Sequence, residues 1–388
     1  MGGPLGSSIP SIEVKLAIRT GAPHTKGVLP PSSISVSSSR HSYDVLVGRG
    51  HLTALGTAIR ARLPKLGERC AVITDAHVEP IYGPAVKASL QAAGFDPVLV
   101  AVPAGESSKS LSAVESVCAE LIAGGVDRRS VVVSVGGGVI GDLAGFVAAI
   151  YHRGIPIVQV PTTIVAQVDS AIGGKTGVNT AGGKNLLGAV HPPSLVLADV
   201  ATLDSLPARQ FREGFAEIIK HGVIADRAML ESLSEFDRSQ DITPLIARNV
   251  GIKAAIVAAD EFETNGGRAT LNFGHTVGHA IEAVAGYGRF HHGEAVAIGI
   301  VVALHLSVTK ARLDEAGRAL VLARLEQFGL PMQVPADLAT DALLAAMRRD
   351  KKFEAGAIRF ILTRRLGTAH VAEDVTEAEI ARAIDAVR

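Results

Sequence analysis

The chain has little cysteine and no excess of charge of either sign. Two cysteines among 388 residues, Cys70 and Cys118, exclude a disulfide framework, and both lie in apolar stretches where a small hydrophobic residue serves equally well. We therefore expect a reducing compartment, the cytoplasm. Lysine plus arginine and aspartate plus glutamate number 38 each, so no overall field favours nucleic acid or an anionic membrane as a partner.

Long apolar runs are also missing. The longest, residues 295–308, is shorter than the ~20 residues of a membrane span and contains His305, so it predicts a buried helix. Residues 1–40 are rich in serine, glycine and proline, hold a single acid, Glu13, and lack the apolar block of a secretory signal. We interpret them as a disordered leader, with an organelle transit peptide as the alternative.

Hydrophobic residues nevertheless make up 47% of the chain, which is enough for a packed core, and the length suggests two domains. From about residue 43, short β-branched runs alternate with helical patterns, and the runs lie at 70–75, 97–102, 130–135, 155–160 and 194–200. Buried strands alternating with helices indicate a parallel sheet covered on both faces. Residues 41–207 are therefore expected to form a doubly wound, Rossmann-like α/β domain.

After Pro207 the pattern becomes one helix after another, apart from a strand-like run at 357–365. We place the domain boundary there. Residues 208–388 are expected to form a second, mainly α-helical domain without internal repeats.

A glycine-rich turn follows the third of these runs and opens a helix. Its glycines at 136, 138 and 141 have the G-x-G-x-x-G spacing, which lets a backbone approach a pyrophosphate at a helix N-terminus. A tight strand-to-helix turn would have the same composition. No acid follows about 20 residues later, as a simple Rossmann dehydrogenase would require, so Asp75, at the end of the first run, is the candidate for binding a ribose.

Two further segments combine charge with unusual composition. Residues 161–190 are glycine-rich and carry Lys175, Lys184 and Asn185, which favours a folded, ligand-facing loop over solvated surface. On the helix predicted at 212–222, one face is apolar and the other is polar, comprising Glu213, Glu217, Lys220 and His221. Ordinary ion pairs on a helix surface would give the same pattern.

Histidines gather in two neighbouring motifs. His275 and His279 are four residues apart at the start of a predicted helix, close enough to bind one zinc ion, and His291 and His292 precede another helix. Each histidine alone would be explained by packing. Together they favour a metal site, which would be closed and structural with four protein ligands but open to substrate with three.

The chain also resembles a known family. The motifs GGGVIGDLAGFVAA, QVPTT, QVDSAIGGKTGVN, GKNLLGA, AEIIKHG, AADEFE, LNFGHTVGHAIE, HHGEAVAIG and DKK occur in the order seen in 3-dehydroquinate synthases, from about residue 43 to the C-terminus. The resemblance implies an NAD-binding α/β domain joined to a helical, zinc-binding domain in a homodimer. It also implies conversion of 3-deoxy-D-arabino-heptulosonate 7-phosphate to 3-dehydroquinate and phosphate, a lyase reaction of the shikimate pathway.

The resemblance also implies roles for individual residues. The metal, zinc or alternatively cobalt, would be bound by Glu217, His275 and His292, with His279 placed for proton transfer. NAD would contact Asp75, Glu106, Lys109, Gly136, Gly137, Gly138, Asp142, Thr162, Thr163, Lys184 and Asn185. The substrate, a sugar acid phosphate, would contact Asp169, Lys175, Lys184, Asn185, Lys220, Lys253, Arg268, Asn272 and Lys351, and Arg153 from the other subunit.

The reaction implied by the resemblance would explain why so many lysine and arginine side chains are assigned to the substrate site. The substrate carries a phosphate and a carboxylate, and one charge pair about 4 Å apart is worth about 4 kcal/mol at an effective dielectric near 20. The implied sequence is oxidation by NAD, β-elimination of phosphate, return of the hydride, ring opening and intramolecular aldol closure, so no net redox change occurs.

Three alternatives are weighed against it. Another sugar-phosphate cyclase, of the kind that makes aminocyclitol precursors, would have no substrate carboxylate for Arg268. A metal-dependent polyol dehydrogenase would not need Lys175 and Lys184. A regulatory protein with structural zinc would need four ligands.

Overall fold

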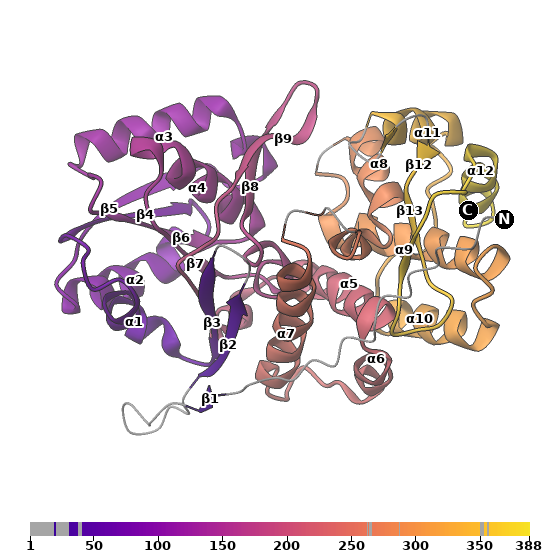
Figure 1. Ribbon diagram of the computed structural model, residues 1–388, viewed down its shortest axis with the longest axis horizontal. Coiled ribbons are helices and arrows are strands. Elements are labelled where there is room, and N and C mark those ends of the chain that lie inside the picture. The colour runs from indigo at the N-terminus through magenta and orange to yellow at the C-terminus, as the bar shows by residue number, and fades with distance from the viewer. Residues whose placement is uncertain are drawn as a thin grey trace, which may run out of the picture.

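The computed structural model describes residues 31–37, 41–261, 263, 266–286, 288–349 and 359–388, and the backbone of 19–20, 353–354 and 357–358. An α/β half and a helical half lie side by side (Figure 1). The α/β half is built on an eight-stranded sheet of order β1-β2-β3-β10-β7-β6-β4-β5. Its strands are β1 (Arg19–Thr20), β2 (Ser32–Ser37), β3 (Ser42–Gly48), β4 (Arg69–Asp75), β5 (Asp96–Val102), β6 (Val131–Gly136), β7 (Ile157–Pro161) and β10 (Leu195–Asp199).

The six strands from β3 to β5 are parallel, and β1 and β2 extend the β3 edge in antiparallel pairs. Helices cover both faces, with α1 (Leu55–Arg62) and α2 (Glu79–Ala92) on one side and α3 (Leu111–Ala123) and α4 (Gly138–Ile150) on the other (Figure 1). All residues of β6, β7 and β10 are buried, which is why these runs lack polar alternation. The predicted doubly wound sheet is confirmed.

The segment at 161–190, expected to be a folded loop, contains a β-hairpin. A short π-helix, Ala166–Ser170 (η4), is followed by β8 (Lys175–Thr180) and β9 (Gly183–Val190). Gly145 of α4 lets the hairpin pack closely, since a Cβ there would lie 2.3 Å from Cγ2 of Thr176. The hairpin projects from the α/β half towards the helical half (Figure 1).

The helical half begins at Ala208, directly after the predicted boundary. Its helices are α5 (Ala208–Ala225), α6 (Arg227–Ser232), α7 (Thr243–Ala259), α8 (His275–Ala285), α9 (His292–Thr309), α10 (Glu315–Gln327), α11 (Thr340–Arg348) and α12 (Glu377–Asp385). Short pairs β11–β12 (Phe353–Glu354, Ala357–Ile358) and β13–β14 (Phe360–Leu362, His370–Ala372) complete it.

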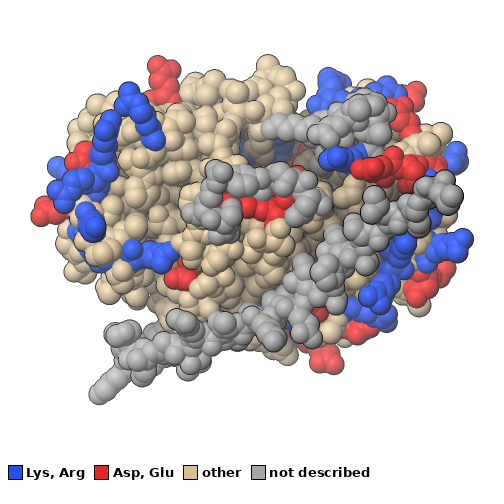
Figure 2. Space-filling view, viewed as in Figure 1, with Lys and Arg blue, Asp and Glu red and all other residues tan. Residues whose placement is uncertain are grey.

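The predicted buried helix corresponds to α9. It is long and apolar enough to cross a membrane, yet 72% of this span is buried within the fold, as in the core helix of a globular protein. Figure 2 shows basic and acidic side chains interspersed on the face in view, as equal numbers of the two predict.

The expected leader needs a correction. Residues Ser32–Ser37 form β2, whose Ile34 and Val36 are buried against the helical half, so this part of 1–40 belongs to the sheet. The prediction of disorder for residues 1–18, 21–30 and 38–40 concerns positions outside the described residues. The largest hydrophobic cluster is continuous from β2, β3 and β10 through α5 and α7 to α12, so the two halves share one core.

Candidate metal and cofactor site

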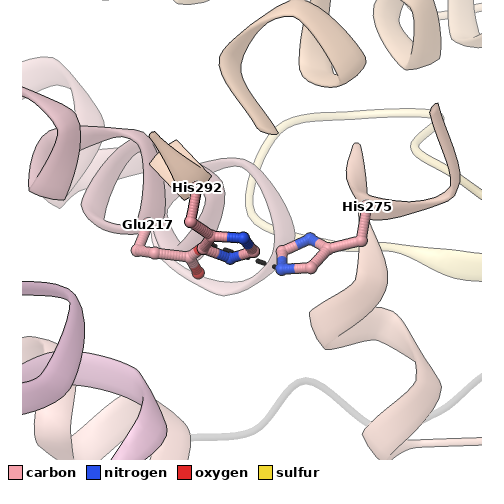
Figure 3. Close-up of side chains that lie close together, drawn as sticks. All are labelled: Glu217, His275 and His292. Atoms are coloured by element: carbon pink, nitrogen blue, oxygen red, sulfur yellow. Dashed lines mark ion pairs between the residues drawn. The ribbon is translucent and has the colours of Figure 1, made fainter. Parts of the chain in front are cut away.

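Glu217, His275 and His292 meet where three helices converge. Nε2 of His275 lies 3.5 Å from Oε1 of Glu217, and Nε2 of His292 lies 3.6 Å from the same oxygen (Figure 3). One potential ligand atom from each residue lies within 4.8 Å of the others. Two imidazole nitrogens and one carboxylate oxygen form a donor set suited to zinc, and among the described residues this group has three members, as in an open site.

Glycine contacts bring the three helices this close. A Cβ on Gly293 in α9 would lie 2.0 Å from the backbone oxygen of Glu213 in α5. A Cβ on Gly299 in α9 would lie 1.9 Å from the backbone oxygen of Gly274, at the start of α8. Because His275 and His292 are the first residues of α8 and α9, this packing points both imidazoles at α5.

Glu217 is fully buried, and neither of its oxygens has a hydrogen-bond donor of good geometry among the described residues. Burial alone would raise the pKa of Glu217, but an ion pair with Lys220 and the nearby His275 hold it well below its ordinary value. A buried carboxylate of this kind requires positive charge beside it. The residues present therefore fit a divalent cation.

Lys220 and Lys253 both contact Asp169 on the η4 segment. Lys220 Nζ lies 4.0 Å from one carboxylate oxygen, and Lys253 pairs with the other while donating to the Asp169 backbone oxygen at 2.6 Å. Burial opposes ionisation of Asp169, but the two ammonium groups lower its pKa. Burial also lowers the pKa of Lys253, whereas the carboxylates of Asp169 and Glu217 raise that of Lys220 against burial.

These contacts exclude one interpretation of the helix at 212–222. Glu217, Lys220 and His221 are all buried, so the polar face of α5 is not a solvated surface with ordinary ion pairs.

Arg268 and Asn272 belong to a 3-10 segment, Arg268–Asn272 (η7), just before α8. The Arg268 guanidinium is buried and donates to the backbone oxygens of Gly173 (3.0 Å) and Glu261 (2.6 Å). Asn272 donates to Glu263 Oε1 at 3.3 Å, and Lys175 pairs with the other oxygen of Glu263.

A second polar cluster surrounds the start of α4. Lys109 is buried and donates to Asp142 (2.7 Å) and to the Asn185 side chain (2.6 Å). Lys184 lies 3.6 Å from Glu106. A pocket of about 360 Å³ adjoins the cluster and is lined by Glu106, Ser107, Lys109, Ser110, Asn179, Thr180 and Ala181.

The glycine turn borders this cluster. Gly137 caps α4 and its Cα faces Thr163, while Thr162 donates its backbone N–H to the Gly136 oxygen at 3.0 Å. The partly exposed backbone at Gly137 and Gly138 and the N-terminus of α4 form a surface suited to phosphate, whereas Gly136 before them is buried. Asp75 ends β4, and its Oδ1 accepts the backbone N–H groups of His77 and Val78.

Arg153, which the resemblance assigns to the site of the other subunit, is remote from this one. Arg153 follows the last turn of α4, so it lies about 20 Å along that helix from the glycine turn. Lys351 lies outside the described residues. His279 is close to the metal candidates, with ring centroids 5.4 Å from His275 and 6.0 Å from His292.

Some polar residues of the site were not predicted. Asn179 joins the second cluster by donating to Glu106 (2.8 Å), and Asn249 accepts from the buried His221 (3.0 Å). Glu282 on α8 is buried next to His292. Spacing could have indicated Glu282, because it lies seven residues after His275 and therefore on the same helix face. Nothing in the sequence pattern singles out Asn179 or Asn249.

Solved structures identify the class. The fold superposes on 2-epi-5-epi-valiolone synthase from Streptomyces hygroscopicus subsp. jinggangensis, a structure with NAD⁺ and Zn²⁺ bound (TM-score 0.81, 32% identity, 90% of this chain and 98% of that one). It also superposes on 2-deoxy-scyllo-inosose synthase complexed with carbaglucose-6-phosphate, NAD⁺ and Co²⁺ (TM-score 0.82, 26% identity, 92% and 100%). The fold is that of the sugar-phosphate cyclases.

Sequence comparison specifies the family. Residues 99–213 match the 3-dehydroquinate synthase N-terminal domain and residues 214–353 match its C-terminal domain. The 3-dehydroquinate synthase of Symbiobacterium thermophilum is 47% identical over 353 residues, covering 89% of this chain and 98% of that protein. The chain belongs to the 3-dehydroquinate synthase family.

Proposed function

We propose that this chain catalyses the reaction of its family, the conversion of 3-deoxy-D-arabino-heptulosonate 7-phosphate to 3-dehydroquinate and phosphate. The observation that carries the proposal is the position of the Glu217, His275 and His292 cluster. Lys220 pairs with Glu217 and also faces Asp169, which in turn contacts Lys253. A three-ligand metal site next to several cations suits a substrate with two anionic groups and a hydroxyl to be activated.

Glu217, His275 and His292 would hold the metal, for which we propose zinc, with cobalt as the alternative. NAD would lie along the glycine turn, near Glu106, Lys109, Asp142, Thr162 and Thr163. When bound, the metal supplies a Lewis acid for the substrate hydroxyl, and NAD supplies a hydride acceptor that is restored within one turnover. Two related cyclases were solved with NAD⁺ and with Zn²⁺ or Co²⁺, which supports both assignments.

The protein's own side chains would bind and orient the substrate. Arg268, Lys175 and Lys184 would bind its carboxylate and phosphate, with help from Asn185 and Asn272. Asp169 keeps Lys220 and Lys253 close together, so the substrate meets fixed ammonium groups that need little reorganisation. His279 would move protons near the reacting hydroxyls, and the surrounding side chains would keep the open-chain intermediate in position for ring closure.

We further propose that the protein acts in the cytoplasm as a homodimer in which Arg153 completes the partner's site. Two observations support the dimer. Arg153 is exposed at the end of α4 remote from the glycine turn, and β9 exposes the apolar side chains of Leu186, Leu187 and Val190. Mixing inactive Arg153→Ala protein with inactive Glu217→Ala protein should restore activity, because each mixed dimer contains one intact site. No recovery after subunit exchange would contradict the shared site.

The decisive assay supplies NAD, zinc and the heptulosonate phosphate. We expect release of inorganic phosphate and formation of 3-dehydroquinate without accumulation of NADH. Steady accumulation of NADH would indicate a polyol dehydrogenase instead. Phosphate release only from a phosphorylated sugar without a carboxylate would indicate another sugar-phosphate cyclase.

The metal assignment has its own test. Glu217→Ala should abolish zinc retention, whereas His279→Ala should keep zinc and lose turnover. Equal loss of zinc in both variants would overturn the division between these residues.

A further inference from the structure

Glu282 lies between the metal candidates and the hairpin. It is 5% exposed, and its Oε1 lies 3.5 Å from Nδ1 of His292 and accepts a hydrogen bond from Lys184 Nζ at 3.0 Å. Its other oxygen is buried without a hydrogen-bond partner among the described residues. One carboxylate therefore contacts both a metal candidate and a lysine from β9.

The position of Glu282 matches what a metal-binding histidine requires. An imidazole that binds a metal through one nitrogen carries its proton on the other, and that N–H needs an acceptor to fix the ring. His275 meets this requirement locally, because its Nδ1 lies 3.2 Å from the backbone oxygen of Phe273 and its Nε2 faces Glu217. His292 has the same orientation, with Nε2 towards Glu217 and Nδ1 towards Glu282.

We propose that Glu282 is a positioning residue for the metal ligand His292, fixing its ring so that Nε2 faces the metal. The proposal rests on the metal site proposed above. Lys184 has a supporting role, since its ammonium neutralises the buried carboxylate and connects it to Glu106, 3.6 Å away. The charge of Glu282 is thus compensated by Lys184 without the metal, so its contact with His292 is not required to neutralise its own charge.

Two substitutions at Glu282 separate positioning from charge. Glu282→Leu removes the acceptor for Nδ1, and we expect the zinc dissociation constant to rise roughly 10- to 100-fold, the usual cost of losing such a partner. In Glu282→Gln the amide oxygen still accepts from Nδ1, so the loss should be smaller. The visible absorption of the cobalt-loaded Gln variant should match that of the unchanged protein.

Two controls address the contact with the hairpin. Glu263→Gln weakens the ion pair between Glu263 and Lys175. This pair also links the hairpin to the helical half, but it involves no histidine. Lys184→Met breaks the Glu282 link from the opposite side. In both, zinc affinity should stay within about threefold of the unchanged protein, because Nδ1 of His292 keeps its acceptor.

The outcomes are distinguishable by competition with a chromophoric chelator. Unchanged zinc affinity in Glu282→Leu, or equal losses in the Leu and Gln variants, would overturn the positioning role. A loss in Lys184→Met as large as in Glu282→Leu would also overturn it, because the hairpin contact would then hold His292. If the unchanged protein retains no zinc at all, the metal site itself fails, which is a different result.

Discussion

Replacing Lys220 with methionine tests whether Lys220 and a metal ion neutralise the same carboxylate. Lys220 and Glu217 are 1% and 0% exposed and form an ion pair three residues apart on α5. Removing one partner of a buried pair leaves the other charge uncompensated, which typically costs about 3–5 kcal/mol. We therefore expect Lys220→Met to lower the free energy of unfolding of metal-free protein by about 4 kcal/mol.

Zinc should reverse most of this loss, because the cation supplies the positive charge that Glu217 then lacks. If about 1 kcal/mol of the loss remains in zinc-saturated protein, the thermodynamic cycle gives about 3 kcal/mol of tighter binding. That difference is roughly a 100-fold lower zinc dissociation constant, at about 1.4 kcal/mol per tenfold.

Urea unfolding followed by circular dichroism, with chelator or with zinc, measures the two losses, and chelator competition measures the affinity independently. Lys310→Met is the control for loss of a lysine–carboxylate pair elsewhere, because Lys310 forms a partly exposed ion pair with Glu379. Lys310→Met should lower the free energy of unfolding by the same amount with and without zinc. If the loss in Lys220→Met is also the same under both conditions, the reasoning is refuted.

Three further outcomes follow from the packing. Gly299→Ala should weaken zinc binding at least tenfold, because a Cβ would lie 1.9 Å from the Gly274 oxygen and push the two ligand-bearing helices apart; unchanged zinc retention would contradict this. Tyr43→Phe should cost about 1–3 kcal/mol in urea unfolding, since the buried Gly173 N–H loses its acceptor; a neutral effect would show that the loop adapts. Backbone and hydroxyl donors at the α12 N-cap and a nearby lysine lower the pKa of Glu379 from 4.5 to about 2. Its stabilising effect is therefore complete above the unfolded pKa and lost as the pH falls through the folded pKa, so the stability gap between the protein and Glu379→Gln should narrow between about pH 4.5 and pH 2.

How far the sequence alone predicts this fold depends on burial. Strands such as β6 are continuous β-branched runs because both faces are covered, and such runs are easy to recognise. The sequence did not reveal the hairpin, because β9 is mostly exposed and both β8 and β9 contain glycine. The strand β2 does show a period of two, in Ile34 and Val36, but its serine-rich surroundings suggested a leader.

The site was predictable in composition but not in its connections. The motif resemblance supplied Glu217, His275 and His292, and the structure groups them. That the polar face of α5 is buried could not be inferred, because a solvated helix has the same amphipathic pattern. Spacing places Glu282 on the same face of α8 as His275, but its contact with His292 joins two helices, and no local pattern reports such a contact.

The shared core limits how this protein can be divided. The two family domains meet between residues 213 and 214, inside α5, and the cluster that includes Val45 of β3 continues into α7. A fragment starting at residue 214 would lose the first turn and a half of α5 and leave the apolar side of α7 in water. Expressed alone it should aggregate rather than fold. The whole chain should unfold in a single thermal transition. A change that destabilises the edge of the sheet would therefore unfold the helical half as well and release the metal.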